Sequence, residues 1–263
     1  MAGLVTENRE KTSLNAHLQA LLSHYGPQNW WPAQTRFEVI VGAYLTQNTS
    51  WRNVELAIAN LRRAGVLNPA GIRGLPLKQL QALVRPSGFF RQKARRLKIF
   101  VRFLDTHYGG FLSRMFAQPT DELRAELLSL EGVGRETADS ILLYAGGHPV
   151  FVVDAYTRRI FGAERHGVFA NAKTMDYDEL RLIMESAFLR DLLPYSMPTA
   201  TINPRHAPSR MSRAKRSDAA RVFAEIHAAI VRTGNDHCRS IPRCEGCPLQ
   251  SFLAKRTCPE NAT

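Results

Sequence analysis

The segment Leu-Glu-Gly-Val-Gly-Arg at residues 130–135 constrains the fold more than any other part of the chain, because it places two glycines between two helical patterns. Before it, leucines recur at helical spacing behind a candidate N-cap at Thr120. After it, apolar residues keep to one helix face until Gly146 and Gly147 end the pattern. The segment predicts a hairpin of two helices, although a Gly-x-Gly sequence by itself also fits an ordinary turn.

The two glycines of this turn, Gly132 and Gly134, allow the backbone to bend sharply and leave amide N–H groups bare at the start of the second helix. Such a helix N-terminus suits a phosphate group. Asp154 follows twenty residues after Gly134, at the end of the apolar run 150–153. A phosphate-binding turn near a carboxylate suggests an active site. The alternative is that Asp154 caps a helix, for which aspartate is well suited.

Basic residues exceed acidic ones, with 35 Lys and Arg against 23 Asp and Glu and a formal net charge of +12. This excess indicates a polyanionic partner, although basic proteins that bind no nucleic acid exist. Two clusters carry much of it: Arg91, Lys93, Arg95, Arg96, Lys98 and Arg102, and then Arg205, Arg210, Arg213, Lys215 and Arg216. Either cluster alone fits a solvated face, but together with the glycine turn they favour the backbone of a nucleic acid.

No stretch of the sequence is long and apolar enough to cross a membrane, and the N-terminus lacks a signal-peptide pattern. We therefore expect a cytoplasmic protein, associated with the nucleoid if the source is bacterial. With 263 residues the chain is long enough for one large domain or two small ones.

The four cysteines all lie near the C-terminus, with the spacing Cys238-x5-Cys244-x2-Cys247-x10-Cys258. A chain that avoids cysteine until residue 238 and then uses four is building a local site. An iron–sulfur cluster accepts such uneven spacing. Structural zinc sites more often show two close cysteine pairs, and disulfides fit poorly with an intracellular location. We rank a cluster first, zinc second and disulfides third.

Helical periodicity runs through nearly the whole chain. We expect helices near 14–25, 35–46, 50–63, 77–84, 92–107, 120–130, 135–145, after Asp154, near 178–192 and near 218–233. The Pro- and Ser-rich segment 193–217 is expected to be a loop. Because no strand alternation is convincing and no internal repeat is present, the predicted fold class is all-α.

Residues 130–134, residues 148–154 and the C-terminal cysteines resemble the endonuclease III superfamily of DNA glycosylases. The signature of that superfamily is a helix-hairpin-helix, a Gly/Pro-rich segment and an aspartate. The resemblance covers most of the chain apart from 193–217. It implies a [4Fe–4S] cluster held by the cysteines, whose spacing departs from the family's usual six, two and five intervening residues. That departure puts the shape of the cluster loop in doubt more than the cluster itself.

The same resemblance implies two α-helical domains. One is a continuous six-helix domain over 34–149 that contains the hairpin, and the other is formed by 1–33 and 150–263 and carries the cysteines. Double-stranded DNA with a damaged base would lie in the groove between them.

Glu136 bears on whether the DNA strand is cut. Superfamily members that cut it carry a lysine two residues after the second hairpin glycine, where the amine forms a Schiff base with the sugar. Glu136 occupies that position here, so we expect no lyase step from this site. Its carboxylate can equally complement the positive end of a helix. The neighbouring Arg135 is expected to contact DNA together with the hairpin glycines.

All three tryptophans, Trp30, Trp31 and Trp51, flank Gln47 in the sequence. The segments Trp30-Trp31-Pro32 and Gln47-Asn48-Thr49 together with Glu136 resemble the 3-methyladenine glycosylase branch, in which such aromatic residues line the base pocket. We therefore expect Trp30, Trp31, Trp51 and Glu136 to line that pocket here. An electron-rich ring attracts a cationic alkylated purine. Tryptophans at a helix junction are also common core residues. By resemblance, Gln47 fills the space that a flipped base leaves in the duplex, and the alternative is an exposed polar residue at a helix end.

We therefore predict a monomeric, monofunctional glycosylase that flips an alkylated purine out of DNA and hydrolyses its N-glycosidic bond. Asp154 would stabilise the positive charge that develops on the sugar or activate the attacking water. One alternative is a glycosylase for oxidised or mismatched bases, which a pocket of tryptophans and Glu136 disfavours. The other is a non-catalytic DNA-binding protein, which would have no need of Asp154.

Overall fold

The computed structural model describes residues 2–191 and 207–253, and every regular element in these ranges is helical. The predicted all-α class is therefore confirmed. An isolated β-bridge between Gly162 and Phe169 belongs to no strand. None of the described helices is long and apolar enough to cross a membrane.

The helices form two compact units. Unit 1 comprises Met1–Trp30, Pro149–Pro208 and Lys215–Thr263, and unit 2 comprises Trp31–His148 and Ser209–Ala214.

The assignment of Ser209–Ala214 to unit 2 differs from the predicted domain of 150–263. Backbone pairing explains it, because the Met211 amide donates to the Ala33 carbonyl over 3.1 Å. The Ser209 hydroxyl donates to the Trp31 carbonyl over 2.9 Å. The first part of the predicted loop 193–217 lies outside the described residues.

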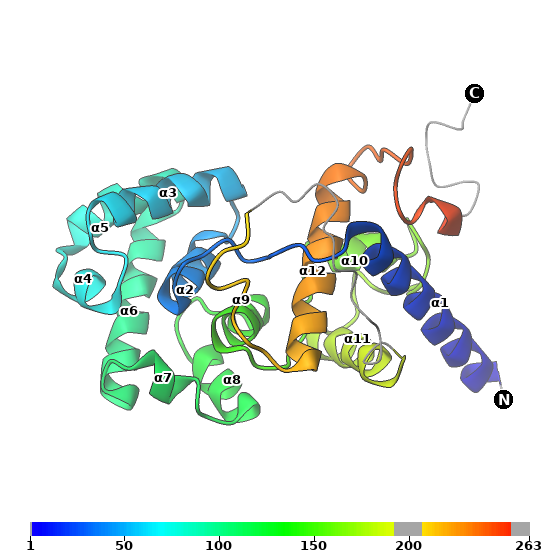
Figure 1. The fold of residues 1–263 in the computed structure, drawn as a ribbon, viewed down its shortest axis with the longest axis horizontal. Helices are drawn as coiled ribbons and strands as arrows, with labels where there is room; N and C mark the ends of the chain where they lie inside the picture. Colours follow the sequence, from blue (N-terminus) through cyan, green and yellow to red (C-terminus); the bar gives the residue numbers. More distant parts are fainter. Residues whose placement is uncertain (1, 192–206, 254–263) are drawn as a thin grey trace. The chain divides into compact units, whose positions relative to one another are not determined.

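Unit 2 holds most of the helices (Figure 1): α2 (Arg36–Leu45), α3 (Trp51–Arg63), α4 (Pro69–Gly74), α5 (Leu77–Val84), a 3-10 turn η1 (Arg85–Ser87), α6 (Phe90–Tyr108), α7 (Leu112–Met115), α8 (Thr120–Leu128), α9 (Arg135–Ser140) and a π-helical segment η2 (Ile141–Gly146). Helix α2 is buried from Phe37 to Leu45 and contacts α3, α6, α9 and η2. It is therefore the central helix of the unit. Helix α6 packs against α2 and also contacts α5 and α7.

Unit 1 consists of α1 (Ala2–Tyr25), α10 (Ala155–Phe161), α11 (Tyr177–Asp191), α12 (Asp218–Asp236) and a 3-10 turn η3 (Gln250–Phe252). Helix α12, orange in Figure 1, contacts α1, α10 and α11. Its buried stripe runs from Ala220 to Gly234 and supplies the centre of this unit's core.

Several helix ends follow local signals in the sequence. The Thr35 hydroxyl accepts from the Glu38 amide over 3.1 Å, and the Glu38 carboxylate accepts from the Gln34 amide over 3.1 Å. This arrangement is a capping box with its return bond shifted by one residue. Gly147, with φ of 78°, ends η2 as predicted.

The predicted cap at Thr120 is wrong. Pro119 is the residue before α8, and no side chain caps that helix. The Thr120 hydroxyl instead lies 3.0 Å from Nδ1 of His148, a buried residue at the far end of the hairpin. Two short helices, α4 and α7, were not predicted, because four to six residues are too few to show a helical period.

Candidate functional site

The turn of the predicted hairpin lies between α8 and α9, and Gly132 is its tightest point. Gly132 has φ of +78°, and a Cβ added there would lie 1.9 Å from Nε of Arg96 on α6. The left-handed backbone conformation therefore favours glycine, and an added Cβ would also force the Arg96 side chain to move. Gly134, at φ of −89°, is the cap residue of α9, whose first turn carries the exposed side chains of Arg135 and Glu136.

Gln47, in the turn between α2 and α3, is bonded to this hairpin. Its amide donates to the Gly132 carbonyl over 3.0 Å and to the Thr137 hydroxyl over 2.9 Å. The Arg96 guanidinium donates to the Gln47 carbonyl oxygen over 3.0 Å. Gln47 is thus no loosely exposed polar residue, and its amide fixes the 46–50 turn against the hairpin. Its predicted insertion into DNA stays a prediction.

Lys93 belongs to the basic cluster of α6, but it does not lie on a solvated face. Its side chain is 1% exposed, and its ammonium donates to the Leu45 carbonyl over 2.9 Å and to the Ser87 carbonyl over 2.6 Å. Burial lowers the pKa of Lys93 to about 8, and the positive charge of Arg96 adds to that effect. The buried ammonium of Lys93 therefore links Leu45, just before the 46–50 turn, to Ser87, just before Gly88.

Other members of the same basic cluster also have partners within the protein. Lys98 donates to the Arg73 carbonyl over 2.9 Å, and Arg95 pairs with Glu131 over 2.8 Å. Of the second basic cluster, Arg205 lies outside the described residues, whereas Arg210, Arg213 and Lys215 are exposed and Arg216 is partly exposed.

The predicted aromatic pocket residues are divided between the units. Trp31 is 5% exposed, with ring centroids 5.3 Å from both Trp51 and Tyr144. Gly42 makes room for Trp31, since a Cβ at position 42 would lie 3.0 Å from the indole ring. Trp31 is thus packed as a core residue, while Trp51 is partly exposed. Trp30 falls in unit 1.

Asp154 is the N-cap of α10 and is buried. Its Oδ1 accepts from the Thr157 amide over 2.7 Å and from the Thr157 hydroxyl over 2.9 Å. The capping role considered from the sequence is therefore real, and it uses one carboxylate oxygen. The other oxygen, Oδ2, lies 3.6 Å from Nε2 of His227 on α12.

Sequence reasoning missed His227. Desolvation by burial pushes the pKa of Asp154 upward, but the interaction with His227 and the bonds from Thr157 outweigh it, so the pKa of Asp154 lies below its ordinary value. The carboxylate is therefore ionised at neutral pH although it is buried. The available signal was a histidine in the apolar stripe of α12, but nothing local links it to a residue 73 positions earlier.

The cysteines lie on the chain after α12. Cys238 and Cys244 are buried and Cys247 is partly exposed, whereas Cys258 lies outside the described residues. Cys238 and Cys247 form no disulfide. Among the residues that the structure describes, no group of three or more His, Cys, Asp or Glu side chains is arranged to hold a metal.

The surroundings of Cys238 nevertheless suit a negatively charged cluster. Burial raises the pKa of Cys238, and the nearby Arg165 and Arg159 oppose that rise. Burial likewise raises the pKa of Cys247 to about 11, and the charge of Cys238 contributes. Burial favours the neutral thiols, so the guanidinium groups of Arg165 and Arg159 are the feature here that would favour thiolate ligands of an anionic cluster.

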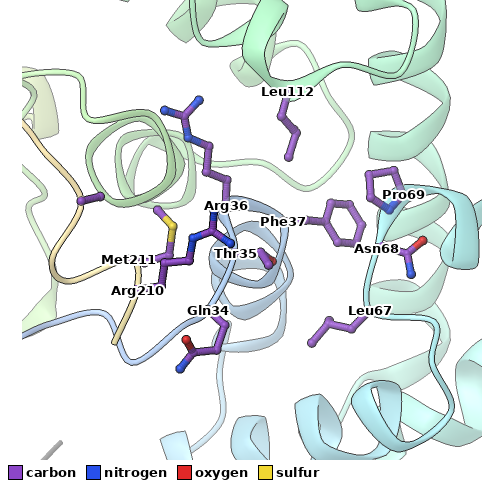
Figure 2. A pocket seen from close by; sticks show the side chains of 11 residues that line it. Gln34, Thr35, Arg36, Phe37, Leu67, Asn68, Pro69, Leu112, Arg210 and Met211 are labelled. Carbon is purple, nitrogen blue, oxygen red and sulfur yellow. The ribbon is translucent and has the colours of Figure 1, made fainter. Parts of the chain in front are cut away.

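A separate cavity of about 590 Å³ lies within unit 2 (Figure 2). In that view Phe37, Leu67 and Pro69 lie on one side and Arg210 and Met211 on the other. Arg210 of the second basic cluster lines this cavity, but none of the residues predicted for catalysis, the base pocket or the hairpin does. Its wall is mostly apolar and holds no carboxylate, so we assign it no part in catalysis.

Comparison with known proteins adds to this geometry. A family model described as "HhH-GPD superfamily base excision DNA repair protein" matches residues 41–182, which include the hairpin and Asp154. A Methanocaldococcus jannaschii protein, described as a "Putative DNA repair glycosylase", is 43% identical over 238 residues, which are 90% of this chain and 93% of that protein.

Two solved structures are similar to the chain. A 3-methyladenine DNA glycosylase of H. pylori bound to 1,N6-ethenoadenine shares 29% identity with a TM-score of 0.65, over 86% of this chain and 97% of that one. A trapped covalent intermediate of endonuclease III with DNA shares 21% identity with a TM-score of 0.68, over 94% of this chain and 96% of that one. At that identity the second likeness is one of fold.

Proposed function

Since the chain belongs to the HhH-GPD superfamily of base excision DNA repair proteins, we propose that it is a monofunctional glycosylase that removes alkylated purines from double-stranded DNA. That it is a DNA glycosylase follows from the family. The substrate class and the lack of strand cutting are the proposal, because the family contains enzymes of both kinds.

The partly exposed ring of Trp51, which packs against the buried ring of Trp31, is the observation that carries the substrate class. Trp51 is partly exposed and its indole N–H donates to the Glu55 carboxylate over 2.9 Å, which orients the ring. An alkylated purine is cationic, and a ring of this kind attracts a cation over its face. The H. pylori relative, a 3-methyladenine glycosylase by name, supports the same substrate class.

Glu136 supports a purely hydrolytic reaction. It is exposed in the first turn of α9, at the position where strand-cutting members of the family carry their lysine. A carboxylate has no amine with which to form a Schiff base. The sugar therefore receives water as its nucleophile, and the product is an intact strand with an abasic site.

In the proposed reaction the damaged base is flipped out of the duplex, because its glycosidic bond is unreachable inside the helix. The bond between C1′ and the base nitrogen breaks, and the base leaves with the electron pair. Water then adds to C1′ and loses a proton to the Asp154 carboxylate or to solvent. Asp154, ionised and buried, stabilises the positive charge on the sugar, and a base that is already cationic leaves without needing a strong acid.

We further propose that Cys238, Cys244, Cys247 and Cys258 hold a [4Fe–4S] cluster, with zinc as the alternative. When bound, such a cluster would crosslink the segment after α12 and place its negative charge near Arg165 and Arg159. The cluster requires four thiolates, one from each of these cysteines.

A panel of lesion-bearing duplexes tests the substrate class. Purified protein is incubated with duplexes that contain an alkylated purine, an oxidised purine or a mismatch, and each reaction is analysed with and without alkali. We expect strand breaks only after alkali and only with the alkylated purine. Release of the oxidised or mismatched base instead would assign the chain to the alternative glycosylase class.

A further inference from the structure

The two oxygens of the Asp154 carboxylate have different surroundings. Oδ1 accepts two hydrogen bonds from Thr157 and is committed to capping α10. Oδ2 takes no part in the cap and faces the imidazole of His227 at 3.6 Å. Helix capping therefore leaves one oxygen of this carboxylate available for chemistry, and His227 is its neighbour.

The separation of 3.6 Å is longer than a normal hydrogen bond, so the interaction between the carboxylate and the imidazole is electrostatic. Both side chains are nearly buried, with 8% of His227 and 10% of Asp154 exposed. Charges interact more strongly in such surroundings than at the surface, because water screens them less. The imidazole is thus placed to affect both the charge and the direction of Oδ2.

The position of His227 is set by the core of unit 1. It lies on α12, which packs against α10, the helix that Asp154 caps. Its ring meets the Phe151 ring edge-on, with centroids 6.4 Å apart and an angle of 83° between the planes. Phe151 precedes Asp154 by three residues. The same short segment therefore carries the ring that packs against His227 and the carboxylate that His227 faces.

We propose that His227 is a positioning residue for Asp154: it holds the Oδ2 oxygen in the direction of the reacting sugar while Thr157 holds Oδ1. This role rests on the proposed function, because it acts only through Asp154. His227 itself need touch neither DNA nor water, and its effect on catalysis is exerted through the carboxylate.

The test uses His227→Phe, which keeps a ring but removes both ring nitrogens, and His227→Gln, which keeps an N–H donor at a similar reach. Single-turnover excision of an alkylated purine from duplex DNA and the dissociation constant for that duplex are measured over a range of pH. We expect the phenylalanine variant to excise about tenfold to a hundredfold more slowly, with DNA affinity within about twofold of wild type. The glutamine variant should recover part of the rate.

The pH profile provides a readout that a merely structural role would not change. Because His227 favours the ionised form of Asp154, its removal should raise the pKa of the carboxyl and move the acidic limb of the rate profile to higher pH. Ile230→Val, a buried change elsewhere on α12, is the matched control for loss of packing and should leave that limb in place.

Asp154→Asn is measured in parallel, so that the two hypotheses can fail separately. If this variant excises normally, the proposed role of Asp154 is overturned. If it is inactive while folded His227→Phe and His227→Gln both match the wild type in rate and pH profile, the role of His227 alone is overturned. Glutamine keeps the side chain polar, so the test holds even if the phenylalanine variant does not fold.

Discussion

The Arg96 guanidinium lies against the α-carbon of Gly132, so close that a Cβ at position 132 would fall 1.9 Å from its Nε. The same guanidinium donates to Gln47, whose amide returns to the Gly132 carbonyl. One arginine of α6 therefore supports both the hairpin turn and the 46–50 turn, and the turn geometry depends on a glycine at position 132.

Replacement of Gly132 by alanine should destabilise the protein. The left-handed conformation and the clash with Arg96 together should lower the free energy of unfolding by about 2 kcal/mol. Gly134→Ala is the matched control, because Gly134 has φ of −89° and nothing lies within 4 Å of its added Cβ. That change should cost less than about 1 kcal/mol. Denaturant unfolding measures both, and equal losses would contradict the argument.

Lys93 should make stability depend on pH in an alkaline window. Its folded-state pKa of about 8 lies below the ordinary 10.5, so between these values the unfolded chain binds a proton that the folded protein does not. Stability should therefore rise with pH across this window, by up to about 3 kcal/mol. Lys93→Met should remove that rise when unfolding is measured from pH 7.5 to 10.5.

Lys78→Met serves as the control for this experiment, because Lys78 is exposed on α5. Its stability profile should keep the alkaline rise of the wild type. An unchanged profile in Lys93→Met would show that the ammonium is not the group responsible.

Two substitutions at Asp154 should separate capping from catalysis. Asparagine keeps an oxygen for the Thr157 bonds but removes the charge, so Asp154→Asn should fold normally, bind DNA and lose excision by about a hundredfold or more. Asp154→Ala removes the cap as well and should also lose about 1 kcal/mol of stability. Near-normal excision by folded Asp154→Asn would remove Asp154 from the mechanism.

Borohydride trapping on lesion DNA should give no covalent adduct with the wild-type protein, because Glu136 offers no amine to the sugar. An endonuclease III treated in the same way supplies the positive control. Efficient trapping of this chain would reveal another amine as the nucleophile, and the monofunctional assignment would be withdrawn.

Anaerobically purified protein should be brown and hold on the order of four irons per chain. Cys247→Ser should lower the iron content and bleach the absorbance. Stoichiometric zinc without iron would support the zinc alternative, whereas neither metal together with a stable disulfide would support the third possibility considered for these cysteines.

The ends of many helices could be predicted from the sequence, because they depend on signals a few residues apart. Thr35 caps α2, Gly147 ends η2, and Asp154 caps α10, each through bonds to the chain beside it. The Gly132–Gly134 turn is local in the same sense, because the positive φ of Gly132 favours glycine at that position whatever the rest of the chain does. Such features identify the hairpin without knowledge of the rest of the fold.

Only the tertiary structure determined which side chains from distant segments contact one another. Lys93 belongs to a stretch of basic residues, and only packing shows that its ammonium lies inside, bonded to Leu45 and Ser87. Gln47 meets Gly132 across 85 positions of sequence, and His227 meets Asp154 across 73. Hydrogen bonds and burial between distant segments leave no periodic trace in the sequence. The sequence by itself therefore determined the hairpin and the candidate catalytic residue. The packing of the helices determined which side chains surround Asp154.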